Sequence, residues 1–235
     1  MQPALESNPS GSLNEDLERA RDREAALREI LNIISRSRDD EAPVFDVILR
    51  SAARLCKAPI AMLWLADTTG THFVHAASHG ESLPSMHVGT FWPMDPRGPV
   101  SRSIRDARSF HTHDLADSDE YRRGEPDFVQ LVDVEGLRTE LSAPLVRDGA
   151  GFGAIILIHR AVDPFDDADI ALVETFAVQA VIAIENVRQF RELQTKLARE
   201  AATREILEVI SRSRDDEEPI FQAILEQAAK LCNAI

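Results

Sequence analysis

Cysteine, long apolar runs and basic charge are scarce in this sequence, and each shortage excludes a class of protein. The two cysteines, Cys56 and Cys232, form no CxxC pair and are too few for a disulfide framework. The longest apolar stretches, Ile60–Ala66 and Ala154–Ile158, are too short to cross a bilayer. Residues 1–14 lack the basic start and the apolar run of a secretory signal. We therefore expect a cytoplasmic protein.

Acidic charge, by contrast, is abundant. The chain carries 40 acidic and 26 basic residues, which gives a formal net charge of -14. A surface of this sign is repelled by nucleic-acid phosphates and by anionic lipid headgroups. We expect neither nucleic acid nor a membrane among the partners of this protein.

One segment of the sequence is present twice. Residues 24–58 read EAALREILNIISRSRDDEAPVFDVILRSAARLCKA, and residues 200–234 read EAATREILEVISRSRDDEEPIFQAILEQAAKLCNA. The register never slips, so the pattern indicates a duplication, and its long period indicates tandem domains. Cys56 and Cys232 occupy the same place on an apolar helix face, where a small buried thiol packs. Because the second copy stops where the first reaches its opening strand, we expect the chain to be part of a longer protein.

Hydrophobic periodicity predicts an α+β domain with an antiparallel sheet. Helical spacing of apolar residues predicts helices over residues 13–35 and 43–56, and a long helix from Ala168 to beyond Leu197. Alternating runs predict two β-hairpins, residues 60–66 with 71–78 and residues 138–147 with 151–160. The second hairpin turns at Asp148-Gly149, a strong turn signal.

The segment between the two hairpins is the least regular part of the chain. It predicts a helix over residues 99–107, a short strand over 109–112, a polar stretch and a short helix near 128–134. Irregular segments of this kind often form one wall of a ligand pocket.

Several short motifs make residues 42–191 resemble the GAF family, as found in bacterial sensor histidine kinases and nucleotide cyclases. These motifs are LCKAP at 55–59, AMLW at 61–64, HG at 79–80, GLRT at 136–139, APL at 143–145, PF at 164–165, VETFA at 173–177 and AVIAIEN at 180–186. The resemblance implies a six-stranded antiparallel sheet flanked by helices, with long N- and C-terminal helices that pair in a homodimer. It also implies that any small ligand lies between the sheet and the irregular middle segment.

The repeat and the resemblance together predict the domain organisation. We expect a disordered N-terminus (1–13), an N-terminal signalling helix (14–41), a GAF domain (42–191), a linker or coiled-coil helix (192–217) and the truncated start of a second GAF domain (218–235). The catalytic output domain of the parent protein is expected to lie outside this chain.

Candidate ligand-binding residues follow from position and chemistry. They are polar or aromatic side chains on the strands and the middle segment, namely His75, Trp92, Phe110, His113, Tyr121 and Ser142. The aromatic members supply contact area in a concave wall, or else plug the face of the sheet. The ligand itself is left open.

The sequence gives less support to three specific ligands: a metal ion, a cyclic nucleotide and a bilin. His111, His113 and Asp114 could ligate a metal, but the further His or Cys ligand of a closed site is missing. The cyclic-nucleotide signature of phosphodiesterase GAF domains departs at His159 and Arg160, and a bilin-attaching cysteine is absent near Phe110. We therefore predict no metal and no cofactor.

Catalysis is not expected within these residues. GAF-type methionine-sulfoxide reductases use several cysteines, whereas the domain here holds Cys56 alone, and no nucleophile, base and orienting acid stand at a recognisable spacing. The sequence predicts a sensory module of a bacterial signalling protein, most simply a histidine kinase. The alternatives are a ligand-free dimerising spacer and the regulatory domain of an adenylate or guanylate cyclase.

Overall fold

The computed structural model describes residues 9–37, 39–212 and 225. The chain divides into two compact units, Met1–Ile184 and Glu185–Ile235. The predicted start of a second GAF domain, residues 218–235, lies outside the described residues except for residue 225, as do residues 1–8 of the predicted disordered terminus.

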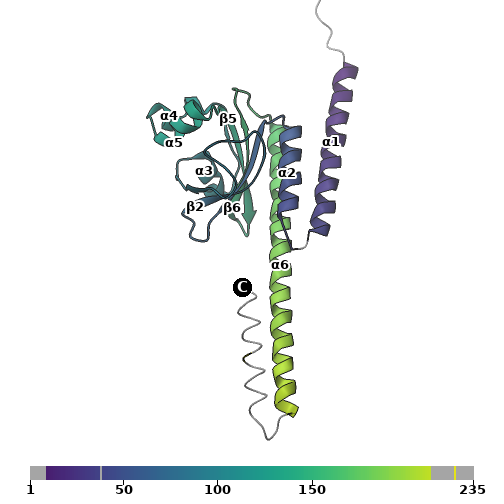
Figure 1. The fold of residues 1–235 in the computed structure, drawn as a ribbon. Coiled ribbons are helices and arrows are strands. Elements are labelled where there is room, and N and C mark those ends of the chain that lie inside the picture. The colour runs from purple at the N-terminus through teal and green to yellow at the C-terminus, as the bar shows by residue number, and fades with distance from the viewer. Residues whose placement is uncertain (1–8, 38, 213–224, 226–235) are drawn as a thin grey trace, which may run out of the picture. The chain divides into compact units, whose positions relative to one another are not determined.

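The first unit holds the sheet and the helices around it (Figure 1). Its strands are β1 (Ile60–Ala66), β2 (His72–Gly80), β3 (Phe91–Pro93), β4 (Phe110–Thr112), β5 (Thr139–Arg147) and β6 (Ala150–His159). Its helices are α1 (Pro9–Arg36), α2 (Ala42–Leu55), α3 (Pro99–Asp106), α4 (Asp119–Arg122) and α5 (Pro126–Val129), with short turns η1 (Leu115–Asp117) and η2 (Gln130–Val134). The helix α6 (Asp167–Arg212) begins in this unit and continues into the second.

The six strands form one antiparallel sheet in the order β3-β2-β1-β6-β5-β4. The predicted hairpins are both present, β1 with β2 and β5 with β6. At the second turn, Asp148 and Gly149 both take positive φ angles, 52° and 80°, as a tight Asp-Gly hairpin turn requires. The hairpins join through β1 and β6 at the centre of the sheet. The predicted six-stranded, GAF-like α+β fold is thus confirmed.

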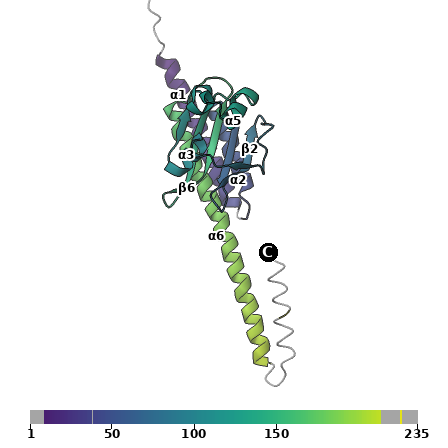
Figure 2. The same cartoon turned by 90° about the vertical axis from the view of Figure 1, so that its left-hand side faces the viewer.

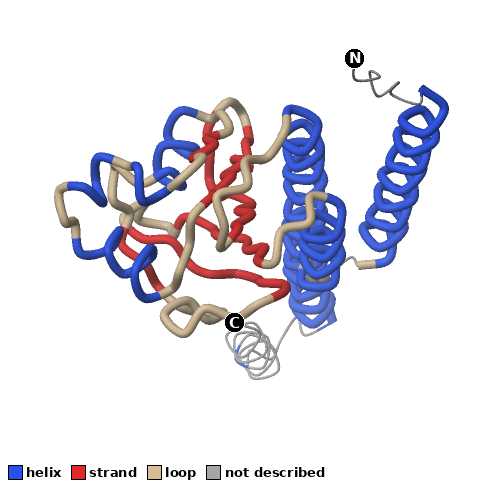
Figure 3. Tube along the Cα trace, turned by 90° about the horizontal axis from the view of Figure 1, so that it is seen from above, coloured by secondary structure: helices blue, strands red, loops and turns tan. Residues whose placement is uncertain are grey.

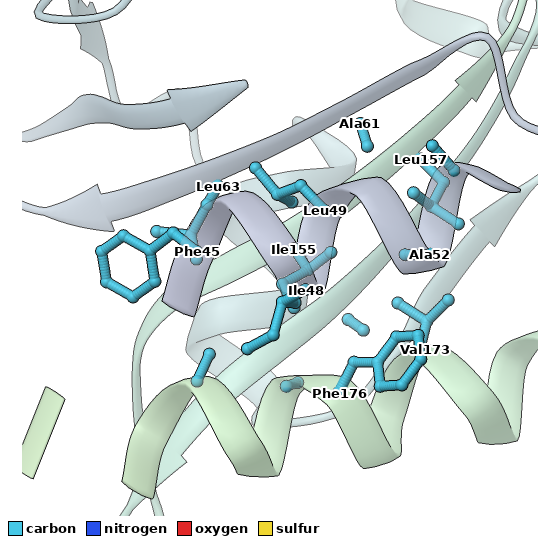
Figure 4. Close-up of a cluster of buried hydrophobic side chains, with 14 of the residues drawn as sticks. Phe45, Ile48, Leu49, Ala52, Ala61, Leu63, Ile155, Leu157, Val173 and Phe176 are labelled. Atoms are coloured by element: carbon cyan, nitrogen blue, oxygen red, sulfur yellow. The ribbon is translucent and has the colours of Figure 1, made fainter. Parts of the chain in front are cut away.

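One face of the sheet packs against α2 and α6, as the views from above and in close-up show (Figures 3 and 4). Successive residues of a strand point to opposite faces, so every second residue of the central strands joins this core. Leu63 and Leu157 reach it from the sheet, and Ile48 and Phe176 reach it from the helices. Figure 1 shows α1 outside this helix pair, and its buried residues Ala26, Ile30 and Ile34 belong to the same core.

The opposite face is covered by the middle segment of the chain, with α3 and α5 over the strands (Figure 2). The intervening residues of the central strands, among them Met62, Trp64 and Ile156, form a second core beneath this cover. Gly151 on β6 allows the close approach of α3, because a Cβ there would lie 2.2 Å from the carbonyl oxygen of Ile104. The middle segment therefore sits directly on the sheet.

Among the described helices, α6 is the one that is long and apolar enough to cross a membrane by length and composition, over Asp167–Arg204. Core helices of soluble proteins pass the same test. The apolar residues Val173, Phe176 and Ala180 of α6 are buried in the core next to the sheet. Packing therefore accounts for the apolar residues on one side of this part of α6, whereas Val178 and Ile182 are exposed.

Candidate functional site

A cavity of about 90 Å³ lies between the sheet and its cover. The strands contribute Met62, Trp64, Phe73 and Ile156 to its wall, and α3, α5 and η2 contribute Val100, Phe128 and Leu131. The cavity thus forms where the irregular middle segment crosses the sheet, which is where the sequence predicted a pocket. Most of the wall is apolar or aromatic, as in typical small-molecule sites.

Glu140 is the charged side chain set deepest in this wall. It lies on β5 between Ile158 of β6 and Thr112 of β4, and 5% of its surface is exposed. Its Oε1 atom has no hydrogen-bond partner among the described residues. Burial alone raises the pKa of Glu140 from 4.5 to about 7, because the ionised form loses its hydration. An unpartnered buried carboxylate is costly to the fold, and this cost suggests a role outside folding.

Trp64 and His75 form a stacked pair beside the cavity. They are cross-strand neighbours, with ring centroids 4.7 Å apart and planes 10° apart. The Nε2–H of His75 donates to the carbonyl oxygen of Ala77 at 3.0 Å, and burial lowers the pKa of the ring. His75 is therefore neutral and supports Trp64, whose indole Nε1–H has no partner among the described residues.

The structure brings only some of the predicted ligand residues together. Trp92 lines the cavity. His75 and Ser142 are buried on the same side of the sheet, but neither side chain belongs to the cavity wall.

The other three predicted residues lie away from this cavity. Phe110 lies beneath the guanidinium groups of Arg102 and Arg108, at 4.3 Å and 4.8 Å from the ring centroid. The ring of His113 contacts that of His111, and the hydroxyl of Tyr121 donates to Asp133 at 2.8 Å. A ligand contact by any of the six residues stays a prediction.

Sequence reasoning missed Glu140 and Trp64. The sequence did hold one signal for Glu140. It is the one carboxylate in the strand TELSAPLVR, whose other residues up to Val146 are uncharged. A charged residue in such a strand faces either solvent or a site, and the strand pattern alone does not say which. The cover formed by α3, α5 and η2 decides the matter by burying this face.

His111 and Asp114, which the sequence offered as metal ligands, make other contacts in the structure. The Nε2 atom of His111 accepts a hydrogen bond from the backbone N–H of Phe165 at 3.2 Å. Asp114 binds Arg138 through two hydrogen bonds of 2.8 Å and 2.6 Å, and this guanidinium lowers the pKa of Asp114. Across residues 9–37 and 39–212, no group of three or more His, Cys, Asp or Glu side chains is placed to hold a metal ion.

Cys56 borders a second, polar cavity of about 390 Å³ near the start of α6. Its thiol is buried, and its pKa is raised far above the usual value, first by loss of hydration and then by the nearby Asp169. A cysteine acts as a nucleophile through its thiolate, so this environment opposes cysteine chemistry. Cys232 lies outside the described residues.

The six-stranded antiparallel sheet has helices on one face and a covered cavity on the other, which defines a GAF-like α+β domain. The family model described as the GAF domain matches residues 39–185, which shows that the chain belongs to the GAF family of regulatory domains. No curated protein is similar enough to this chain to count as a match.

Solved structures share the fold at low sequence identity. Residues 122 to 287 of a methyl-accepting chemotaxis protein are 21% identical, with a TM-score of 0.57 over 70% of this chain and 99% of that one. The free methionine-R-sulfoxide reductase from Neisseria meningitidis is 15% identical, with a TM-score of 0.58 over 80% and 98% of the two chains. A domain described as part of a two-component sensor histidine kinase from Sinorhizobium meliloti 1021 is 19% identical, with a TM-score of 0.51 over 65% and 95%.

Proposed function

We propose that this chain is the sensory GAF module of a bacterial signal-transduction protein, with a sensor histidine kinase as the favoured parent. In this proposal a small ligand occupies the cavity beneath α3, α5 and η2, and the signal leaves through α1 and α6 in a cytoplasmic homodimer. The observation that carries the proposal is the cavity itself, whose wall holds polar groups without partners among the described residues.

The central strands offer a direct mechanical route from the cavity to the helices. On β1, Met62 and Trp64 line the cavity, while Leu63 between them packs in the core with Phe176 of α6. A ligand that displaces the cavity residues therefore shifts a strand whose other face supports α6. Two arrangements of the helices need differ by only about 1–3 kcal/mol in ligand affinity for this coupling to act as a switch.

Two structural neighbours support a signalling role. One belongs to a chemotaxis protein and another to a protein described as a sensor histidine kinase. A third structural neighbour is a reductase, so an enzyme with the same fold is also known. The raised pKa of the Cys56 thiol favours the sensory role over that chemistry.

The experiment compares the purified protein by native and denaturing mass spectrometry and then screens a metabolite library by thermal shift. We expect a ligand that is lost on denaturation or that raises the melting temperature. The variant Ser101→Leu fills the cavity from α3 and is expected to abolish this binding. The same change at the exposed Ser35 of α1 is the matched control.

A ligand-free dimerising spacer is the second candidate, and the small size of the cavity favours it. The sensory proposal is wrong if the protein binds no compound, or if Ser101→Leu leaves the binding unchanged. The spacer role then replaces it.

A further inference from the structure

The charged residues in the wall of the cavity are all acidic, which disfavours anionic ligands. Of the residues that line it, Asp95, Asp127 and Glu140 are acidic, and none of the lining side chains described is Arg, Lys or His. A ligand phosphate or carboxylate would meet only like charge there. The cavity is therefore unsuited to anions, including the phosphate group of a nucleotide.

The three carboxylates differ in how much charge they leave for a ligand. Asp95 is paired with Arg97 at 2.9 Å, and Arg97 also binds Glu125. Asp127 is exposed to solvent at the start of α5, where water screens its charge. Glu140 is buried and has an oxygen without a partner, so it is the group in the cavity that lacks a counter-charge.

Within the part of the chain that the structure describes, no Arg, Lys or His is paired with Glu140. Its cross-strand neighbours are Thr112 and Ile158, both uncharged, and the described residues that line the cavity include no Arg, Lys or His. An ionised carboxylate that is buried without a partner is costly, and here the described residues supply no group of opposite sign to pair with it.

Aromatic rings complete the environment. Trp64, Phe73, Trp92 and Phe128 all line the cavity. The faces of aromatic rings attract organic cations, most strongly in the case of tryptophan. A carboxylate among aromatic rings is the environment that binds an ammonium or amidinium group.

The geometry points to a small organic cation as the ligand of this cavity, with its ammonium or amidinium group on Glu140 and a short apolar body against Trp64 and Trp92. This inference rests on the proposed sensory function and names the chemical class of its ligand. The volume sets the size: a cavity of about 150 Å³ takes benzene, so one of about 90 Å³ takes a short alkylammonium.

The two tryptophans of the chain give a direct readout of binding. Trp64 and Trp92 are the only tryptophans in the sequence, and both line the cavity. A ligand that enters changes their fluorescence. The full chain is titrated with ethylammonium, with its neutral counterpart ethanol and with the anion acetate, at constant ionic strength.

We expect ethylammonium to bind at least about 10-fold more tightly than ethanol, and acetate not to bind. The variant Glu140→Gln keeps the shape of the side chain and removes its charge, and it should weaken ammonium binding at least about 10-fold without weakening binding of the alcohol. Glu18→Gln removes the same charge from an exposed site on α1 and should change nothing. The ammonium affinity of the wild-type protein should also rise between pH 5.5 and pH 8, as Glu140 ionises.

Three other results would contradict, in turn, the cation inference, the role of Glu140 and the proposed sensory function. If the alcohol or acetate binds as well as the ammonium, and Ser101→Leu abolishes that binding, the cavity is a ligand site but the cation inference is wrong. If Glu140→Gln binds the ammonium as tightly as the wild type, Glu140 is not its partner. If no probe of any charge binds and the metabolite screen is also negative, the proposed sensory function fails together with the inference.

Discussion

Glu140 should make the stability of the protein depend on pH in an unusual direction. Its pKa is about 7 in the folded protein against an ordinary value of 4.5, so the folded state holds the proton more tightly than the unfolded state. Stability contributed by this group is therefore complete below about pH 4.5 and is lost as the pH rises through about 7. The shift corresponds to about 3 kcal/mol in the free energy of unfolding.

Glu140→Gln isolates this effect, because the variant cannot ionise at this position. We expect its free energy of unfolding, relative to that of the wild type, to rise by about 3 kcal/mol between pH 4 and pH 8. Urea denaturation at both pH values measures the difference. Carboxylates with lowered pKa values, such as Asp114, are common to both proteins and cancel in the comparison. A difference that stays constant with pH would show that Glu140 is hydrated or paired in solution.

Cys56 should be unreactive in the folded protein. The side chain is buried, and loss of hydration together with Asp169 raises its pKa well above that of a free thiol. In a Cys232→Ser variant, which leaves Cys56 as the one thiol, we expect labelling by a disulfide reagent at pH 8 to be at least about 100-fold slower than in urea. If the native protein is labelled at the rate of a free thiol, Cys56 is reactive and the argument against cysteine chemistry is wrong.

At the scale of the element, α3 ends in a strained conformation. Its C-cap residue is Ala107, in the left-handed region with φ 48° and ψ 40°. Glycine takes this conformation without the clash of a Cβ atom, so Ala107→Gly should raise the free energy of unfolding by about 0.5–1 kcal/mol. The midpoint of urea denaturation at an unchanged slope measures it.

Ala150→Gly is the matched comparison for the same change in a strand. Ala150 opens β6 with ordinary strand geometry, so glycine there should lower stability by a similar amount. If both substitutions destabilise the protein, the conformation at Ala107 is not the source of strain.

The elements of the sheet show which predictions local pattern supports. The turn of the β5/β6 hairpin was predicted at Asp148-Gly149 because these residue types tolerate positive φ, and both residues have it. The strand β3 and the short helix α4 were not predicted, since each spans only three or four residues. Elements this short carry little periodicity: the strand β4 was predicted although it has three residues, whereas β3 and α4 are fixed by the contacts around them.

At the scale of the molecule, the second unit carries apolar residues suited to pairing. Leu193 and Leu197 on α6 are 54% and 56% exposed and lie four residues apart, on the same helix face. We predict that the protein is a dimer in solution and that Leu193→Lys combined with Leu197→Lys shifts it to the monomer. Sedimentation velocity measures the change.

Thr195→Lys is the control for that double variant. Thr195 is exposed and lies roughly on the opposite side of the helix, so an added charge there should leave the dimer intact. A wild-type protein that sediments as a monomer, or a double variant that remains dimeric, would rule out pairing through this face of α6.

The sequence by itself determined the fold class, the two hairpins and the family resemblance. These features rest on local signals: the spacing of apolar residues, the Asp148-Gly149 turn, and short motifs such as LCKAP at 55–59. It also located the pocket region, because an irregular segment between two hairpins has to cross the sheet that they form. Trp92 was among its candidates and lies in the cavity wall.

Only the tertiary structure decided which residues meet in that cavity. The pairing of β1 with β6 joins two hairpins that are far apart in the sequence, and no local pattern specifies this contact. The pairing places Trp64 of β1 and Glu140 of β5 on one wall. Alternation along β5 shows that Glu140 and Leu141 face opposite ways, but which face is buried depends on what covers it. Here α3, α5 and η2 cover the face of Glu140, and this burial makes its carboxylate the most distinctive chemical feature of the protein.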